Sequence, residues 1–262
     1  MSQQQTEARE ADEAARASFY AIYSETHSST QEQGMMTQIE KTLSTSKDDE
    51  EILGTSQTFP KFASITGDGI MIGTCTGVVH ASPEEVSAYM FLTDTHQARK
   101  THIAANGPDN SKYPLKTIHA INDHHNINYS CRKLPPPLNP RDWLTRNIIQ
   151  RVDADTIKYF CTSINDDEPD LPPNFTKTTL HNAIRGEISM IHEYERLPHN
   201  QTRFTLRMKL DIKGSIPKKI ANMGMSGALN SVYKAYKYFQ RDEEIDELEV
   251  SLICCKRGAV RC

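Results

Sequence analysis

The hydrophobic period changes within residues 203–239, and this change limits the possible folds more than any other feature. Apolar residues first alternate with polar ones, which predicts a strand with one buried face: Phe204, Leu206, Met208, Leu210 and Ile212. After a turn at 213–217, apolar residues recur at three- and four-residue steps: Ala221, Met225, Leu229, Val232, Tyr236 and Phe239. This spacing predicts an amphipathic helix of about 25 residues packed over the preceding sheet.

Composition sets the size and general character of the protein. The chain has 262 residues, enough for one large domain or two small ones, and 37% of them are hydrophobic. Residues 1–60 hold 4 basic and 11 acidic residues, a net charge of −7, whereas the remainder carries +3. Nucleic-acid binding usually requires a clustered basic face, so we expect no nucleic-acid partner.

Export and membrane-spanning segments are not expected from the sequence. The N-terminus is acidic where a signal peptide is basic, and no run of about 18 apolar residues occurs. The six cysteines form no CxxC pair, and His119, His124 and His125 lack a recognised ligand spacing, so we expect no metal and no cofactor. These features favour a cytoplasmic protein with reduced thiols.

Three segments are expected along the chain. Residues 1–54 are predicted to be helical and partly mobile, with a short amphipathic helix at Met35–Leu43 that need not pack on the main domain. Residues 55–243 form the folded body, and 244–262 form a tail whose cysteines could be acylated or simply disordered. Within the body, Ser82-Pro83-Glu84-Glu85 is a capping-box start for a helix that ends near Thr95.

Most of the body is predicted to be strand. A first strand is expected at 70–81, and later ones at 115–122, 126–132, 142–152, 156–164, 183–196 and 202–213. Hairpin-length gaps join several of these pairs, and the four prolines in 134–140 require an irregular loop. Sequential hairpins imply an antiparallel sheet, so the fold class is α+β.

Three motifs in this order resemble START domains, the steroidogenic-acute-regulatory-related lipid-transfer family. Pro140-Arg141-Asp142-Trp143-Leu144 is similar to that family's strand signature. Residues 211–219 resemble the stretch that leads into its C-terminal helix, and 81–86 resemble the start of its second helix. The resemblance covers roughly residues 55–243. It implies a helix-grip fold, in which a curved antiparallel sheet closes over a long C-terminal helix around an apolar tunnel.

The resemblance also implies non-enzymatic binding of one lipid (a sterol, phospholipid or sphingolipid) and transfer between membranes. We expect a monomer that contacts membrane surfaces transiently. The candidate lipid-binding residues are Tyr129, Asn147, Leu206, Met208, Leu210, Met225, Leu229, Val232 and Tyr236. The candidate gate and membrane-contact residues are Leu134, Leu138, Gly214, Lys218 and Lys219.

The sequence departs from the family at one position that matters for the ligand. Several members place a cavity-facing arginine six positions after the signature arginine, and Asn147 stands there in this chain. Arg146 is one residue early, which in a strand means the opposite face unless a bulge shifts the register. Tyr129 and Asn147 are therefore our candidates for the polar groups that orient a lipid.

Simpler readings remain open for these residues. By its pattern alone, the helix stripe from Met225 to Tyr236 is more typical of ordinary core, and Lys218 and Lys219 are at least as typical of a solvated surface. Two alternative functions follow: a regulatory or interaction domain with a lipid-sensing or vestigial cavity, and a helix-grip cyclase or hydrolase. The enzyme alternative needs convergent titratable groups, and the sequence shows none with convincing spacing.

Overall fold

A single sheet organises the structure, a computed structural model that describes residues 28–44, 51–56, 59–65, 71–93, 95–108, 113–172, 182–214, 216 and 218–240. The strands are β1 (Glu51–Ser56), β2 (Phe59–Ile65), β3 (Met71–Val79), β4 (Leu115–Asn122), β5 (His125–Arg132), β6 (Arg141–Arg151), β7 (Thr156–Ser163), β8 (Ile184–Arg185), β9 (Glu187–Leu197) and β10 (Gln201–Asp211). The helices are α2 (Thr30–Leu43), α3 (Pro83–Phe91), α4 (His96–Asn106), α5 (Lys218–Leu229) and α6 (Ser231–Phe239).

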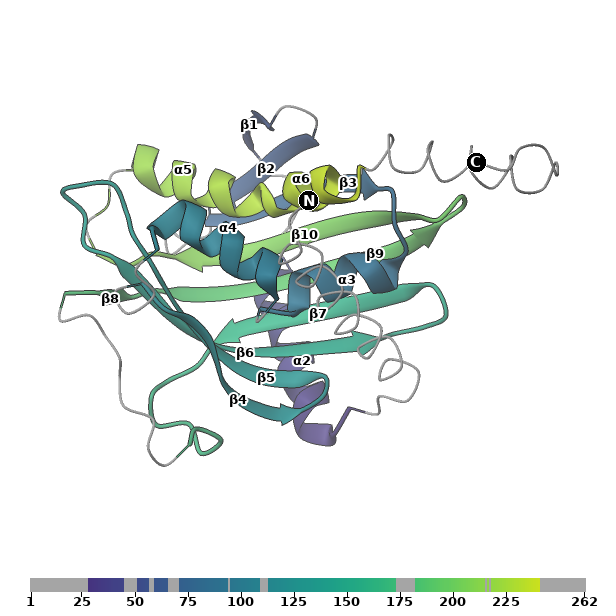
Figure 1. Cartoon of the computed structure of the whole chain (residues 1–262), viewed down its shortest axis with the longest axis horizontal. Helices are drawn as coiled ribbons and strands as arrows, with labels where there is room; N and C mark the ends of the chain where they lie inside the picture. The colour runs from purple at the N-terminus through teal and green to yellow at the C-terminus, as the bar shows by residue number, and fades with distance from the viewer. Residues whose placement is uncertain are drawn as a thin grey trace, which may run out of the picture.

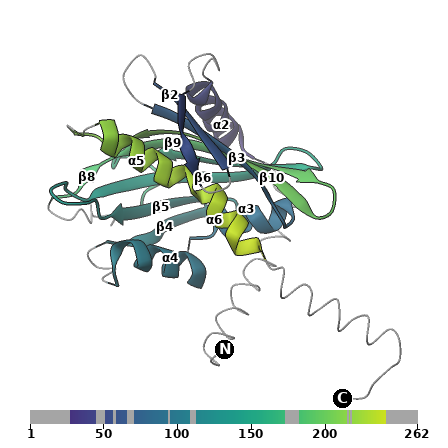
Figure 2. The same ribbon diagram turned by 90° about the horizontal axis from the view of Figure 1, so that it is seen from above.

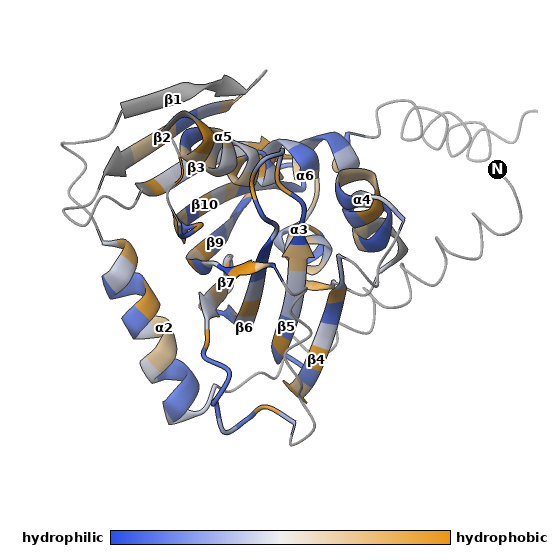
Figure 3. Ribbon diagram, turned by 90° about the vertical axis from the view of Figure 1, so that its left-hand side faces the viewer, coloured by the Kyte–Doolittle hydropathy of each residue, from blue (hydrophilic) through white to orange (hydrophobic). Residues whose placement is uncertain are grey.

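The sheet is antiparallel along its main path, as predicted. Its order is β1-β2-β3-β10-β9-β7-β6-β5-β4, and β8 adds a two-residue parallel pairing beside the start of β6. Helices α3, α4, α5 and α6 lie on one face, which we call the inner face (Figures 1 and 2). Helix α2 lies on the other, the outer face (Figure 3). The predicted α+β helix-grip class is therefore confirmed.

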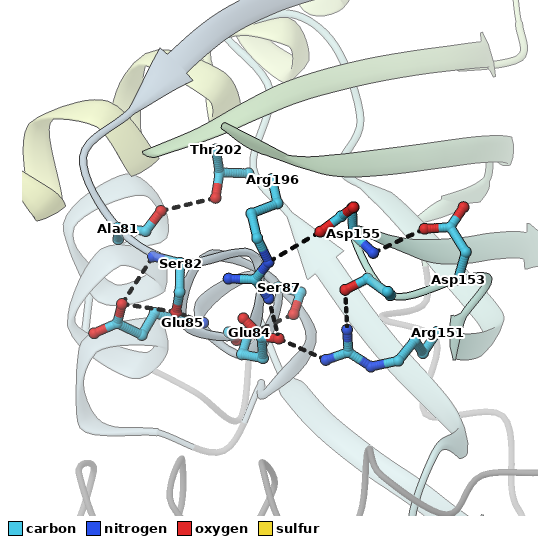
Figure 4. Close-up of polar contacts among 11 residues, drawn as sticks. Ala81, Ser82, Glu84, Glu85, Ser87, Arg151, Asp153, Asp155, Arg196 and Thr202 are labelled. Carbon is cyan, nitrogen blue, oxygen red and sulfur yellow. Dashed lines mark hydrogen bonds and ion pairs between the residues drawn. The ribbon is translucent and has the colours of Figure 1, made fainter. Parts of the chain in front are cut away.

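Helix α3 is held against the sheet by one carboxylate. The predicted capping box is present: the Ser82 Oγ accepts from the Glu85 amide, and the Glu85 carboxylate accepts from the Ser82 amide. Glu84 then accepts from the Arg151 and Arg196 guanidinium groups, each at 2.6 Å (Figure 4). Burial raises the pKa of Glu84, but these arginines more than offset it and the net shift is downward. The charged network therefore joins α3 to the ends of β6 and β9.

The C-terminal helix is shorter and more segmented than predicted. Instead of one helix of about 25 residues, α5 and α6 meet at Asn230, whose ψ of −8° departs from helical geometry. The Ser231 hydroxyl donates to the Ala228 carbonyl at this break. Gly224, Gly227 and Asn230 are poor helix formers, which weakens a continuous helix here. The apolar stripe nevertheless runs through both helices.

The N-terminal part of the described chain belongs to the same body. Helix α2 buries Met36, Ile39 and Leu43 on the outer face, against Ile148 of β6 and Phe160 of β7. The predicted boundary between residues 54 and 55 falls inside β1. Residues 30–43 therefore pack on the domain, a point that the sequence had left open. Predictions for residues 1–27 and 244–262 lie outside the described residues.

Candidate functional site

The predicted apolar residues meet on the inner face. Leu206 and Met208 of β10 are 1% and 2% exposed, and Met225, Leu229 and Val232 are fully buried opposite them. All five belong to one hydrophobic cluster, against which Leu210 and Tyr236 also pack. A Cβ placed on Gly73 would lie 2.5 Å from the Met225 Sδ, so α5 approaches β3 closely. This part of the inner face is packed by side chains, and contact of these residues with a lipid stays a prediction.

A polar group adjoins this apolar cluster on the same face. The Tyr159 hydroxyl of β7 donates to the Asn147 Oδ1 of β6 at 2.8 Å, and both side chains are buried. The ring of His192 on β9 lies 4.8 Å from that of Tyr159, measured between centroids. Burial lowers the pKa of His192 to about 3, so the ring is neutral. Its Nδ1 lies 2.8 Å from the Tyr194 hydroxyl.

One buried carbonyl oxygen in this polar group is uncommitted. Asn128 of β5 pairs in register with Thr145, which places it on the inner face with Asn147. The side chain is 6% exposed, and its Oδ1 has no hydrogen-bond partner among the described residues. Leaving a buried carbonyl unsatisfied costs about 1–3 kcal/mol. A ligand hydroxyl or amide placed here would therefore gain a preformed acceptor.

Tyr129 lies on the wrong face for the role we expected. The hydroxyl donates to the Asp142 Oδ2 at 3.0 Å within an outer-face cluster that contains Ile127 and Leu144. Burial and the neighbouring Asp142 carboxylate raise its pKa. Tyr129 pairs in register with Leu144, one residue out of phase with the inner-face Thr145. Tyr129 and Asn147 are therefore on opposite sides of the sheet and cannot orient the same lipid headgroup.

The strand parity of Arg146 and Asn147 is as predicted. β5 and β6 pair without a register shift, so Arg146 faces outward and Asn147 inward. The Arg146 guanidinium lies 3.1 Å from Glu168 and 2.7 Å from Asp170, in the loop after β7. The inner face thus carries an amide where several START domains carry an arginine.

Arg141 connects the two segments predicted to form a gate. Its buried guanidinium donates to the Asn139 carbonyl at 2.6 Å and to the Lys213 carbonyl at 3.1 Å. It also donates to the carbonyl of Ile212. The proline-rich loop and the turn after β10 are therefore joined by one side chain.

The other gate candidates lie in or beside these two segments. Leu134 and Leu138 are half-buried in the proline-rich loop. Gly214 has a φ of 79°, a left-handed conformation that suits glycine, and its Cβ position would be 3.5 Å from the Arg141 Nη2. Lys218 and Lys219 begin α5, but their side chains lie outside the described ones. Membrane contact by these residues stays a prediction.

A buried lysine fastens α5 to the sheet. The Lys61 ammonium of β2 donates to the backbone carbonyl and to the hydroxyl of Ser226, each at 3.0 Å. Burial lowers its pKa, although the nearby Cys75 partly opposes this shift. Since the Ser226 carbonyl also accepts from the Asn230 amide, Lys61 strengthens the helix just before its break.

We expect the substitution Lys61→Met to loosen α5 without unfolding the protein. Methionine fills a similar volume and removes the cost of burying an ammonium, so global stability should change by less than about 1 kcal/mol. Losing the two charged hydrogen bonds should speed amide exchange in 218–230 by roughly ten-fold. Hydrogen exchange with mass spectrometry measures this, and Lys116→Met on exposed β4 is the control. Equal exchange in both variants would show that Lys61 does not restrain α5.

None of the described helices is long and apolar enough to cross a membrane. Across the same residues, histidine, cysteine, aspartate and glutamate side chains form no group of three that could hold a metal ion.

Comparison with known proteins identifies the fold. No family model and no curated protein matches the chain. The lipid transfer and protein localization domain of human StarD13 matches with a TM-score of 0.57 and 14% identity, over 82% of this chain and 100% of that one. Human StAR-related lipid transfer protein 5 matches with a TM-score of 0.53 and 16% identity, over 90% and 100%. Human STARD10 gives 0.55 and 16%, over 84% of each chain.

These matches define the architecture as a helix-grip fold. More specifically, the chain has the START-domain fold, as the three sequence motifs implied. At 14–16% identity the likeness concerns the fold.

The polar inner-face group is what the sequence analysis missed. Tyr159, His192 and Asn128 were read only as strand residues. Residues two apart in a strand lie on one face, so the sequence does indicate that Tyr159 shares a face with Cys161, and that His192 shares one with Met190 and Tyr194. The contacts of Tyr159 with Asn147 and His192 depend on the pairings among β6, β7 and β9, which the sequence does not show.

Proposed function

We propose that this protein binds one lipid non-enzymatically on its inner face, beneath α5 and α6, and carries it between membrane surfaces. The observation that carries the proposal is the uncommitted Oδ1 of Asn128, which lies on the same face of the sheet as the apolar cluster of Leu206, Met225 and Leu229. Lipid sites combine such a wall with a few placed polar groups. The matched human proteins are described as lipid-transfer proteins, which supports the same kind of ligand here.

The protonation states of the inner-face groups support binding rather than catalysis. His192 is neutral and buried, and burial raises the pKa of Cys161 to about 12, so its thiol is protonated near neutral pH. Burial likewise raises the pKa of Cys75 to about 11. General acid–base or nucleophilic work needs groups whose pKa lies near the working pH.

Enclosure in the protein would offset the cost of taking a lipid out of a membrane. Each methylene left in water costs about 0.8 kcal/mol, so an acyl chain or sterol ring system is held only when most of it is enclosed. Helices α5 and α6 are the elements that would enclose it. The break at Asn230 would let α5 move separately from α6 once its contacts with Lys61 and the sheet are released.

A regulatory domain with a filled interior is the second candidate, and the close approach of Met225 to Gly73 favours it. Native mass spectrometry separates the two. The full-length protein is incubated with vesicles of mixed cholesterol, ceramide and phospholipid, re-isolated by gel filtration and measured without denaturation. We expect one lipid per protein. Repeated recovery of lipid-free protein alone would reject lipid carriage and favour the regulatory candidate.

A further inference from the structure

A pocket lies in the sheet where strand β7 ends. Strands β7 and β9 pair in register as far as Thr162 and Ser189, and the two chains then diverge. Before that point the chain that enters β9 pairs, as β8, with the start of β6. The gap has a volume of about 360 Å³ and is lined by two segments, residues 162–166 and 185–189. This volume is at the lower end of the roughly 300–1,000 Å³ that small-molecule sites occupy.

Side chains bridge the two diverging segments at both ends of the pocket. At one end the Thr162 and Ser189 hydroxyls lie 3.3 Å apart and share a hydrogen bond. At the other end the Arg185 guanidinium donates to the Asp166 carboxylate at 3.0 Å. Between these ends the Ser163 hydroxyl accepts from a backbone amide of β9 at 2.9 Å, where a backbone carbonyl would accept if the sheet continued. The gap is therefore held open by the protein's own side chains.

The charged groups of the pocket are already paired within the protein. Besides its contact with Asp166, the Arg185 guanidinium donates to Asp142, also at 3.0 Å. The Glu187 carboxylate lies 3.0 Å from the Lys213 ammonium. An ionic ligand would compete with one of these pairs, whereas a neutral ligand would leave them intact. The pocket therefore favours a molecule without formal charge.

Hydroxyl protons in the pocket lack acceptors among the described residues. The Ser163 oxygen accepts from the β9 amide, and its own proton has no acceptor. Thr162 and Ser189 share a single hydrogen bond, which uses only one of their two protons. The exposed Asn165 amide likewise makes no side-chain hydrogen bond within this part of the chain. These groups match a ligand that offers oxygen acceptors.

Two buried N–H groups beside the pocket are also without a hydrogen-bond partner in the residues that the structure describes. They are the Arg185 Nε and the Trp143 Nε1. The indole nitrogen borders the lining, because a Cβ on Gly186 would lie 2.6 Å from it. Buried donors in proteins are nearly always paired with protein atoms, bound water or a ligand. The unpaired donors therefore favour an oxygen-rich molecule in the gap.

We propose that this pocket is a second binding site, which takes a small neutral molecule with several hydroxyl groups, such as a sugar or a cyclitol. Each ligand hydroxyl can accept from an unpaired donor and can donate to the Glu187 carboxylate, so it suits both kinds of group in the lining. All lining residues belong to the two diverging segments, so the site is separate from the lipid position beneath α5 and α6. Sugar binding here does not depend on lipid binding.

Trp143 is the only tryptophan of the chain, and its position against Gly186 makes its fluorescence a probe of this pocket. The full-length protein is titrated with myo-inositol, glucose or glycerol, and with betaine, an osmolyte without hydroxyl groups, to measure general solvent effects. The variant Thr162→Val removes one lining hydroxyl. Its control is Thr205→Val, because Thr205 forms the same kind of hydroxyl pair with Thr76, at 3.0 Å and outside the pocket.

We expect a saturable change in Trp143 fluorescence with inositol or glucose, with a dissociation constant on the order of 1 mM, and no saturable change with betaine. Thr162→Val should raise the dissociation constant about five-fold, because one hydrogen bond to the ligand is lost. Thr205→Val should match wild type. A linear response to every polyol like that to betaine, or equal binding by wild type and Thr162→Val, would overturn the proposal.

A second variant tests the position of the site without altering the hydroxyl pair. Asn165→Leu places an apolar side chain at the exposed mouth of the pocket and removes the amide, so it should weaken binding at least five-fold. Asn182→Leu is its control, since Asn182 is also exposed but does not line the pocket. Circular dichroism checks that each variant is folded. If the two leucine variants bind inositol equally well, the ligand does not occupy this pocket.

Further titrations test the class of ligand and its source. Inorganic phosphate or ethylenediamine bound more tightly than inositol would show that the pocket selects a charged group, and the neutral class would fail. Vesicles with glucosylceramide are compared with vesicles that contain ceramide alone. A response to glucosylceramide but not to free glucose would support the same hydroxyl chemistry with a lipid headgroup as its source. An equal response to both vesicles, with none to free sugars, would overturn the assignment.

Discussion

The substitution Arg141→Ala should lower the free energy of unfolding by about 3–5 kcal/mol. The guanidinium is 2% exposed and donates to the carbonyls of Asn139, Ile212 and Lys213. Truncation leaves these backbone acceptors without their donor and opens a cavity where the side chain was. Because the three carbonyls belong to two separate segments, the loop 134–140 and the turn 212–214 should both lose protection from hydrogen exchange.

Urea denaturation measures the first effect, with an unchanged m-value as the sign that stability alone has changed. Arg141→Lys should fall between wild type and alanine, since one ammonium cannot reach all three carbonyls. Arg203→Ala is the matched control, because its 2.6 Å pair with Glu195 is exposed and should contribute less than about 1 kcal/mol. A loss below about 1 kcal/mol for Arg141→Ala, or increased exchange in only one segment, would contradict the connecting role.

Local patterns in the sequence identified the elements that are set by local interactions. The alternation around Phe204–Leu210 predicted β10, and the Ser82–Glu85 capping box predicted the start of α3. Hairpin spacing predicted β4 to β7 to within about one residue at most ends. Each of these signals lies within about ten residues, so no knowledge of distant contacts was needed.

Elements that depend on distant contacts were missed or misassigned. Helix α4 has a weak apolar stripe, with Ile103 45% exposed, so its sequence offered little periodicity. Strand β5 was misassigned for another reason. Its apolar residues lie on the outer face of the sheet and its polar residues on the inner face, the opposite of what is usual for a strand over a core. Its outer face holds Ile127, Tyr129 and Cys131, whereas its inner face holds the polar Asn128. Choosing the apolar face as the inner one therefore placed Tyr129 wrongly.

The residues of the candidate site also fall into those that local periodicity predicted and those that depend on distant contacts. Met225, Leu229 and Leu206 were selected from periodicity, and they do pack together. Tyr159, Asn147 and His192 come together only through the pairings among β6, β7 and β9, between segments up to tens of residues apart. Short-range reasoning therefore recovered the apolar residues and Asn147, but not the partners that Asn147 meets on the neighbouring strands.

The second large effect concerns the attachment of α2. Glu32 is 4% exposed, and its Oε1 lies 2.7 Å from the His125 Nδ1 and 3.2 Å from the Asn122 Nδ2, both at the β4–β5 turn. Its Oε2 accepts from the Ser29 amide at 2.7 Å as part of a capping box. Glu32→Ala removes the carboxylate half of the capping box and leaves the buried His125 Nδ1 without its partner. We expect it to cost about 2–4 kcal/mol of stability and to release α2 from the outer face.

Acid should weaken the same attachment in two stages. Burial raises the pKa of Glu32, but hydrogen bonds from Ser29, Asn122 and His125 outweigh it and lower the pKa to about 2 from 4.5. A lowered carboxyl pKa stabilises the fold above pH 4.5, and this contribution is lost as the pH falls toward 2. Burial also lowers the pKa of His125 below 6.5, with Glu32 in partial opposition. Because the unfolded chain protonates that ring more readily, stability already begins to fall below about pH 6.5.

Denaturation midpoints measured from pH 7 to pH 3 test both stages, with limited proteolysis reporting on the release of residues 30–43. Glu32→Ala should flatten the decline between pH 4.5 and 3, because the coupled carboxylate is gone. Glu40→Ala is the control on the same helix: its carboxylate pairs with Lys158 at 3.1 Å but is 48% exposed, so it should change stability by less than about 1 kcal/mol. If the two variants have equal stability and parallel pH profiles, the buried Glu32 contacts do not hold α2 on the sheet.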